Sequence, residues 1–149
     1  MKSKPRILFL CTGNSCRSQM AEGFTRALKG GVLEPYSAGI APAGVDRRAV
    51  AAMAEAGVDI SGQRSKSVDE FDDLDVDYVV TLCSGAQNAC PVFPARVRVL
   101  HAPFDDPPSL AAGARSEEEA MAPYRRVRDE IGDFVLSLPE SLEKGAKDE

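Results

Sequence analysis

The chain has 149 residues, 44% of them hydrophobic and 28% charged, and its formal net charge at pH 7 is −5. This length and composition are typical of one soluble domain with a sizeable core, which excludes disordered, fibrous and membrane-spanning chains. The negative charge argues against a nucleic-acid-binding surface. A core of this size needs no disulfide bonds, so we expect the four cysteines to be reduced thiols of a cytoplasmic protein.

Short apolar runs alternate along the chain with segments of helical periodicity, a pattern typical of βαβ units and a mostly parallel sheet. The first strand is predicted over residues 7–10, a continuous apolar run that is too short for the core of a signal peptide. No other apolar run approaches the length that crosses a bilayer. The later strands are predicted at residues 32–38, 77–82 and 96–100, and the helices at 18–28, 46–54 and between Ser116 and Pro139.

Local signals define the ends of the helices. Asp46 is the predicted N-cap of the second helix, and Ser116 with Glu119 forms a capping box for the last one. Pro123 is expected either to kink the last helix or to mark its true start. Residues 140–149 are expected to form a frayed tail. The whole chain is therefore predicted to be one three-layer α/β domain, a four-stranded parallel sheet flanked by helices, with any active site at the carboxyl ends of the strands.

The most specific motif follows the first strand, where a Cys-x5-Arg pattern joins it to an amphipathic helix. Its residues are Cys11-Thr12-Gly13-Asn14-Ser15-Cys16-Arg17-Ser18. The backbone N–H groups of such a loop can point at one tetrahedral oxyanion, and Arg17 can add a bidentate contact. In this positive environment the pKa of the Cys11 thiol is expected to fall below its ordinary value. The loop therefore predicts a thiolate nucleophile beside an oxyanion site, although Cys11 could instead be a small buried residue at a strand end.

Other residues of the loop have supporting roles. Asn14 is expected to brace the loop through side-chain hydrogen bonds, and Ser18 to stabilise the thiolate, cap the helix or do both. Cys16 is expected to be a small loop residue without a catalytic thiol. A second Cys-x5-Arg match, from Cys90 to Arg96, contains two prolines and leads into a strand, so it cannot form the same kind of oxyanion-binding loop.

A candidate general acid lies after the fourth strand, on the same side of the sheet as Cys11. Asp106, followed by Pro107, would hold a carboxyl over the site and protonate a departing oxygen, a step that an oxygen leaving group needs. The alternative is that Asp105 and Asp106 are ordinary turn residues. His101, the single histidine, is expected to be structural.

Two further cysteines follow the third strand. Cys83 would lie beside the end of the first strand, within reach of Cys11, and Cys90 could reach Cys83 if the intervening loop folds back. This placement suggests a thiol relay, although two unrelated loop cysteines remain the alternative. A zinc site is not expected, because the chain lacks compact cysteine pairs and has one histidine.

With these residues assembled, the sequence resembles the thioredoxin-coupled arsenate reductases, which are built on the low-molecular-weight protein tyrosine phosphatase fold. The resemblance covers nearly the whole chain; its motifs are residues 11–23, Ser37-Ala38-Gly39, Val79, Thr81-Leu82-Cys83, Cys90-Pro91, Asp106-Pro107 and residues 125–131. The loop is common to phosphatases and reductases, whereas Cys83 and Cys90 at these positions are typical of the reductases.

The resemblance implies a mechanism and a set of partners. Cys11 would attack arsenate held by the loop and Arg17, and Asp106 would protonate the departing oxygen. Cys83 would then attack Cys11 to release arsenite, and Cys90 would move the disulfide to Cys83–Cys90 for reduction by thioredoxin. Phosphate or sulfate would mimic arsenate, no metal or organic redox cofactor would be needed, and the enzyme would act as a monomer in arsenic detoxification.

The sequence departs from the family pattern at a residue of a cation site, and two alternative functions have to be considered. Some family members bind potassium through residues matching Asn14, Glu22 and Ser37 and through an Asp, but Lys66 stands at the place of that Asp, so we expect its ammonium in place of the ion. The alternative function is a low-molecular-weight tyrosine phosphatase using Cys11, Arg17 and Asp106. The segment Pro108-Ser109-Leu110 argues against it, because phosphatases place aromatic residues there. A non-catalytic oxyanion-binding or redox-sensing module would need no general acid, so the Asp106-Pro107 pair argues against that reading.

Overall fold

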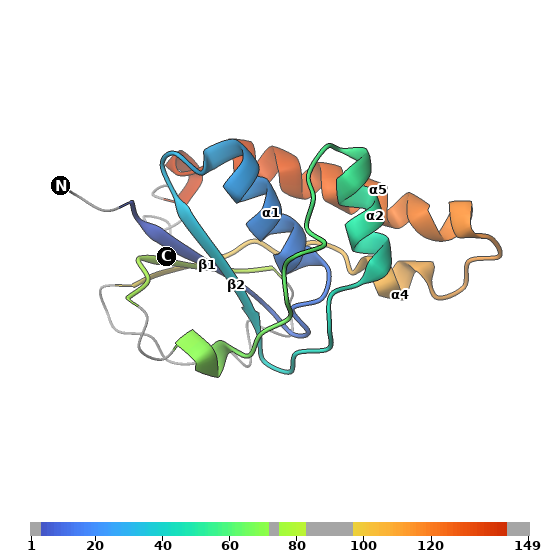
Figure 1. Cartoon of the computed structure of the whole chain (residues 1–149), viewed down its shortest axis with the longest axis horizontal. Helices are drawn as coiled ribbons and strands as arrows, with labels where there is room; N and C mark the ends of the chain where they lie inside the picture. Colours follow the sequence, from blue (N-terminus) through green and yellow to red (C-terminus); the bar gives the residue numbers. More distant parts are fainter. Residues whose placement is uncertain (1–3, 72–74, 83–96, 143–149) are drawn as a thin grey trace.

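The computed structural model describes residues 4–71, 75–82 and 97–142 (Figure 1). Its centre is a four-stranded parallel sheet with the strand order β2-β1-β3-β4. The strands are β1 (Arg6–Cys11), β2 (Glu34–Gly39), β3 (Tyr78–Thr81) and β4 (Arg98–His101). The chain runs from β1 outward to β2 and then crosses to β3 on the other side of β1. The carboxyl end of β1 therefore lies at the switch point where open α/β sheets bind their ligands, as the sequence predicted.

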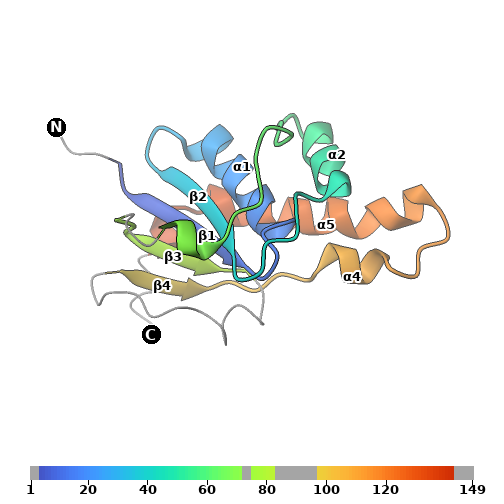
Figure 2. The same ribbon diagram turned by 60° about the horizontal axis from the view of Figure 1, so that its bottom comes forward.

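Both faces of the sheet are covered, which explains the unbroken apolar run in β1. Ile7 and Phe9 face a cluster formed with the helices, whereas Leu8 and Leu10 face a second cluster on the opposite side. Figure 2 shows α1 (Arg17–Lys29), α2 (Arg47–Glu55) and α5 (Glu117–Leu136) together on one side of the sheet. The second cluster includes Phe71, the last residue of the 3-10 helix η1 (Val68–Phe71).

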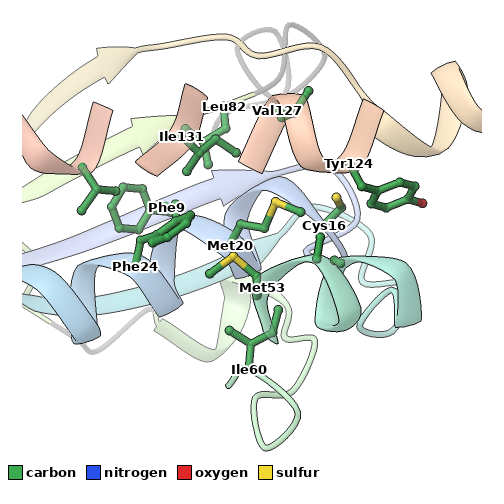
Figure 3. Packing of buried hydrophobic residues seen from close by; sticks show 14 of the residues in the cluster. Phe9, Cys16, Met20, Phe24, Met53, Ile60, Leu82, Tyr124, Val127 and Ile131 are labelled. Atoms are coloured by element: carbon green, nitrogen blue, oxygen red, sulfur yellow. The ribbon is translucent and has the colours of Figure 1, made fainter. Parts of the chain in front are cut away.

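The larger cluster fixes α1, and with it the loop that precedes this helix. Figure 3 shows side chains of β1, α1, α2 and α5 packed together; those labelled include Phe9, Met20, Phe24, Met53, Val127 and Ile131. Because α1 begins where the loop ends, burial of its apolar face holds the loop against the sheet.

The predicted helix caps are confirmed. Asp46 precedes α2 and accepts a hydrogen bond from the Arg48 amide at 2.8 Å, and Ser116 precedes α5 and accepts one from the Glu119 amide at 3.1 Å. Pro123 lies well inside α5 and so does not mark its start.

Other boundaries differ from the sequence prediction. β2 begins at Glu34 and not at Val32, because the amides of Val32 and Leu33 bond to the Lys29 carbonyl at 3.0 and 2.9 Å and close the end of α1. β3 is shorter than predicted, and β4 extends to His101. The short helix α4 (Pro107–Ala111) and η1 were not predicted.

The end of the chain also departs from the prediction of a tail frayed from residue 140. Leu142 is 2% exposed and packs in the main core, so an apolar side chain anchors the segment beyond the last long helix. Residues 143–149 lie outside the described part. Among the helices described, none is long and apolar enough to span a membrane.

The tight packing of α1 yields a stability prediction at Gly23. A Cβ at this position would lie 2.5 Å from Cγ2 of Ile60, a branched methyl close to its own backbone. We expect Gly23→Ala to lower the free energy of unfolding by about 1 kcal/mol, because overpacking of about 1–3 kcal/mol outweighs a gain in helix propensity of about 1 kcal/mol.

Urea-induced unfolding measures this change. Gly62→Ala is the matched control, because no atom lies within 4 Å of a Cβ there. A Gly23→Ala variant more stable than its parent would show that the contact with Ile60 is not a constraint.

Candidate active site

The carbonyl groups of the loop between β1 and α1 accept hydrogen bonds from the surrounding chain, which hold the loop in place. Cys11 O accepts from the amide of Ile40 (3.2 Å), Thr12 O from Ala41 (2.8 Å), Gly13 O from Ala43 (2.9 Å), Ser15 O from Asp46 (2.9 Å) and Cys16 O from Met20 (2.9 Å). Asn14 O accepts from Nε2 of Gln19 at 3.0 Å, and Gly13 O also accepts from Oγ of Ser65 at 3.1 Å. Every loop carbonyl from Cys11 to Cys16 thus has a donor in the surrounding chain.

This ring of donors determines where the loop amides point. In a planar trans peptide the C=O and the following N–H point in opposite directions. A carbonyl held outward therefore turns the next amide toward the centre of the loop. We infer that the amides of residues 12–17 point toward this centre, beside the N-terminus of α1, as a cradle for a tetrahedral anion requires.

Asn14 supplies the sharpest bend of the loop. Its φ is +47°, a left-handed conformation in which Asn is among the better-tolerated residues. Its fully buried side chain donates to Oγ of Ser18 at 2.8 Å and accepts from the amide of Lys66 at 2.7 Å. The predicted bracing role of Asn14 matches these contacts. Ser18, as the acceptor, keeps its own O–H proton for another partner.

The loop also approaches the end of β2 closely. A Cβ on Gly39 would lie 2.7 Å from the Thr12 carbonyl oxygen and 2.8 Å from the Asn14 amide nitrogen. Only glycine fits without displacing backbone atoms, which gives the Ser37-Ala38-Gly39 motif a physical reason.

Arg17 lies at the start of α1 and turns its guanidinium toward the loop after β4. Its Nη1 donates to the Phe104 carbonyl at 3.0 Å, and its Nη2 lies 3.3 Å from Oδ1 of Asp106. Among the described residues, its buried Nε has no hydrogen-bond partner. A buried guanidinium N–H without an acceptor is costly, and an oxyanion in the cradle would satisfy it.

Asp106 follows β4 and lies beside Arg17, immediately before α4. Its Oδ2 accepts a hydrogen bond from Oγ of Ser109 at 2.7 Å, and its side chain is 38% exposed. His101 contacts Oγ1 of Thr81 through Nδ1 at 2.6 Å and so joins β4 to β3, in line with the structural role predicted for it.

Both cysteines of the loop are buried, Cys11 at 4% and Cys16 at 3% exposure. The Cys16 side chain packs in the main core, where Figure 3 shows it close to Tyr124. Burial raises the pKa of this thiol far above its ordinary value, with the nearby Asp46 carboxylate as a second cause. Cys16 therefore contributes its backbone amide to the loop and no thiolate.

Cys83 and Cys90 lie outside the described residues. The residue before Cys83 is Leu82, whose amide donates to the Leu10 carbonyl at 3.0 Å. Leu82 therefore lies beside Leu10, the residue that precedes the candidate nucleophile Cys11 in the chain.

A cluster of polar side chains surrounds Glu22 of α1. The carboxylate of Glu22 accepts hydrogen bonds from Ser37 and Arg26, and Nζ of Lys66 lies 3.6 Å from Glu22 Oε1 and 2.7 Å from the Arg64 carbonyl. Burial lowers the pKa of Lys66, while the Glu22 carboxylate opposes this shift. The Lys66 ammonium thus lies beside Glu22, one of the residues at which the resemblance implied a potassium site.

Sequence reasoning found the loop, its arginine and the candidate acid, but missed the donors to the loop carbonyls and the Phe104 carbonyl that accepts from Arg17. The segment 40–43 and Gln19, Ser65 and Phe104 carry no local signal of their role, because each acts through a contact distant in sequence or through a backbone group. The glycine of Ser37-Ala38-Gly39 was the one sign of a close approach.

The chain is similar to known proteins over nearly its whole length. Residues 6–148 match the family described as low molecular weight phosphotyrosine protein phosphatase. An arsenate reductase of Bacillus licheniformis is 48% identical over 141 residues, which cover 95% of this chain and 99% of the relative. A solved structure of an arsenate reductase in the phosphate binding state is 34% identical, with a TM-score of 0.70 over 93% of this chain and 98% of that one. The low molecular weight protein tyrosine phosphatase from T. tengcongensis is 26% identical, with a TM-score of 0.73 and coverage of 93% and 99%.

The bend at Asn14 gives a prediction for the stability of the loop. We expect Asn14→Ala to lower the free energy of unfolding by about 2–3 kcal/mol, because alanine at positive φ costs about 1 kcal/mol and each lost hydrogen bond about 1 kcal/mol. Asn14→Gly loses the same hydrogen bonds without the cost in φ, so its stability should lie between those of the parent and the alanine variant. Urea unfolding of the three proteins separates the two effects, and equal losses in both variants would contradict the role given to φ.

Proposed function

The chain belongs to the low molecular weight phosphotyrosine protein phosphatase family and is an arsenate reductase, and we propose that it works through a Cys11–Cys83–Cys90 thiol relay. The observation that supports the oxyanion-binding part of this proposal most directly is the buried Nε–H of Arg17, which has no acceptor among the described residues. The outward carbonyls of the loop support amides that point inward next to Cys11. A tetrahedral oxyanion such as arsenate meets both requirements, and phosphate or sulfate would bind in the same way.

The first chemical step joins sulfur to arsenic. The Cys11 thiolate attacks the bound arsenate, an S–As bond forms and one As–O bond breaks. Asp106 gives a proton to the departing oxygen, which leaves as water. Its carboxyl is 3.3 Å from the Arg17 Nη2, so the acid lies at the edge of the group that would hold the anion. We expect the hydroxyl of Ser18, whose oxygen accepts from Asn14, to donate a hydrogen bond to the thiolate.

The second step carries the reduction. A thiolate at Cys83 attacks the Cys11 sulfur, and an S–S bond forms while the S–As bond breaks. The electron pair of that bond stays on arsenic, which gains two electrons and leaves as arsenite. Cys90 then attacks Cys83, restores the Cys11 thiolate and leaves a Cys83–Cys90 disulfide. The placement of Leu82 beside Leu10 supports the approach of Cys83 to Cys11.

The proposed cycle determines which reductant and which cellular compartment the enzyme needs. The two electrons come from thiols, so no metal or organic redox cofactor is needed, and thioredoxin is the proposed reductant of the final disulfide. Such a cycle suits the cytoplasm, where thiols are kept reduced, and a role in arsenic detoxification. All residues of the proposed relay come from one chain, which is consistent with a monomeric enzyme.

A weak phosphatase activity is the second candidate. Phosphate and arsenate share shape and charge, and Cys11, Arg17 and Asp106 suffice for hydrolysis of a phosphomonoester. Ser109 follows the Asp-Pro segment and bonds to Asp106, where a phosphotyrosine pocket would offer an aromatic side chain. We therefore expect slow hydrolysis of aryl phosphates as a side activity.

The relay is tested by arsenate-dependent consumption of NADPH in the presence of thioredoxin and its reductase. Cys83→Ser and Cys90→Ser should each abolish turnover, because neither variant can pass its disulfide to thioredoxin. Hydrolysis of an aryl phosphate by the same variants is the control, and it should persist because the loop, Arg17 and Asp106 are unchanged. Normal arsenate turnover in both variants would exclude the relay.

The Lys66 ammonium gives a second prediction. Because Lys66 already places a positive charge beside Glu22, arsenate turnover by the parent enzyme should be the same in potassium and sodium chloride at equal ionic strength. Lys66→Asp removes that charge and adds a carboxylate, so turnover should fall in sodium chloride and recover in potassium chloride. Lys4→Asp has the same change in charge at an exposed position and is the control. Potassium dependence of the parent enzyme would contradict the assignment.

A further inference from the structure

We propose that Tyr124 is a positioning residue for the oxyanion loop, and that it acts through Asp46. Tyr124 is on α5, far from the loop in sequence, and it is 1% exposed. Figure 3 shows its ring beside Cys16. Its hydroxyl donates to Oδ2 of Asp46 at 2.5 Å. The proposal rests on the oxyanion-binding function proposed above and extends it to a residue outside the loop.

Asp46 links Tyr124 to the loop because three of its groups have defined partners. Oδ2 accepts from Tyr124, Oδ1 accepts from the Arg48 amide at 2.8 Å, and the Asp46 amide donates to the Ser15 carbonyl at 2.9 Å. With both carboxylate oxygens held by α5 and α2, the backbone of Asp46 has little freedom to turn. Its amide is therefore fixed in the direction of the loop.

The contact at Ser15 has a consequence for the cradle. The Ser15 carbonyl and the Cys16 amide belong to one peptide plane and point in opposite directions. When Asp46 holds the carbonyl outward, the Cys16 amide points toward the bound anion. Loss of the Tyr124 hydroxyl would leave Asp46 Oδ2 without this buried donor, and a small rotation of Asp46 would tilt the Ser15–Cys16 peptide.

Charge gives a second reason for the link. The Asp46 carboxylate is close enough to Cys16 to raise the pKa of that thiol, so an unrestrained Asp46 would repel an anion in the loop. Tyr124 and the start of α2 both donate to this carboxylate and hold it on the side of the helices. Burial and the Asp46 carboxylate raise the pKa of Tyr124 above its ordinary value, so its hydroxyl remains a donor at neutral pH.

The test compares Tyr124→Phe with Tyr36→Phe. Both changes remove a hydroxyl that donates to a carboxylate, but Tyr36 bonds to Glu34 on β2 and has no part in the loop. Titration calorimetry of the reduced enzyme with inorganic phosphate measures binding in the cradle. We expect phosphate to bind about tenfold more weakly to Tyr124→Phe, less than the 10²–10³-fold effect on catalysis of removing an oxyanion donor outright, and within twofold of the parent for Tyr36→Phe.

Steady-state kinetics separates positioning from a general loss of stability. A tilted amide weakens the binding of arsenate, so its KM should rise about tenfold in Tyr124→Phe while kcat changes less than threefold. A merely destabilised protein would lose folded enzyme and hence apparent kcat at an unchanged KM. That pattern, or equal phosphate binding by Tyr124→Phe and the parent, would overturn the proposal.

Asp46→Ala and the double variant test the route of the effect. If Tyr124 acts through Asp46, adding Tyr124→Phe to Asp46→Ala should weaken phosphate binding no further. Additive losses would show that Tyr124 acts by another route and would overturn the proposal. A parent enzyme that binds no phosphate would refute the oxyanion site itself, and with it the positioning role, whereas a parent that binds phosphate isolates the result for Tyr124.

Discussion

A peptide unit points its carbonyl and its amide in opposite directions, and the loop after β1 uses this constraint at successive residues. Hydrogen bonds from residues 40–46, Gln19, Met20 and Ser65 hold the carbonyls outward, so the amides turn inward, and Arg17 is the side chain that we expect to join them at the anion. The site is thus built before a ligand arrives. This preorganisation is what lets backbone dipoles stabilise a charged substrate in a partly buried position.

The rest of the structure holds the loop and the donors to its carbonyls in place. The buried faces of β1 and α1 fix the two ends of the loop, Gly39 lets β2 approach its backbone, and Asn14 makes the left-handed bend. Arg17 at the start of α1 and Asp106 after β4 form an ion pair at the edge of the candidate site. The same cradle would serve a phosphatase or a reductase equally well, so we propose that the thiols of Cys83 and Cys90 decide between the two chemistries.

The sequence allowed the parts with local signals to be predicted. The apolar run of β1, the loop motif and the caps at Asp46 and Ser116 depend on residues close together in the chain, and the structure agrees with them. The outer ring of donors could not be predicted, because backbone amides leave no residue preference and their partners are distant in sequence. The short helix α4 was missed because its Pro-Pro start resembles a turn, and the anchoring of Leu142 because one apolar residue in a polar tail gives no periodicity.

We propose that the electrons for arsenate reduction come from the chain's own cysteines. The decisive experiment is a single turnover without thioredoxin: fully reduced enzyme receives one equivalent of arsenate, and arsenite, remaining thiols and disulfide-linked peptides are then measured. We expect one arsenite per enzyme, the loss of two thiols and a Cys83–Cys90 disulfide, with Cys11 again open to alkylation. Arsenite release without loss of thiols, or arsenate left unreduced by the fully reduced enzyme, would contradict it.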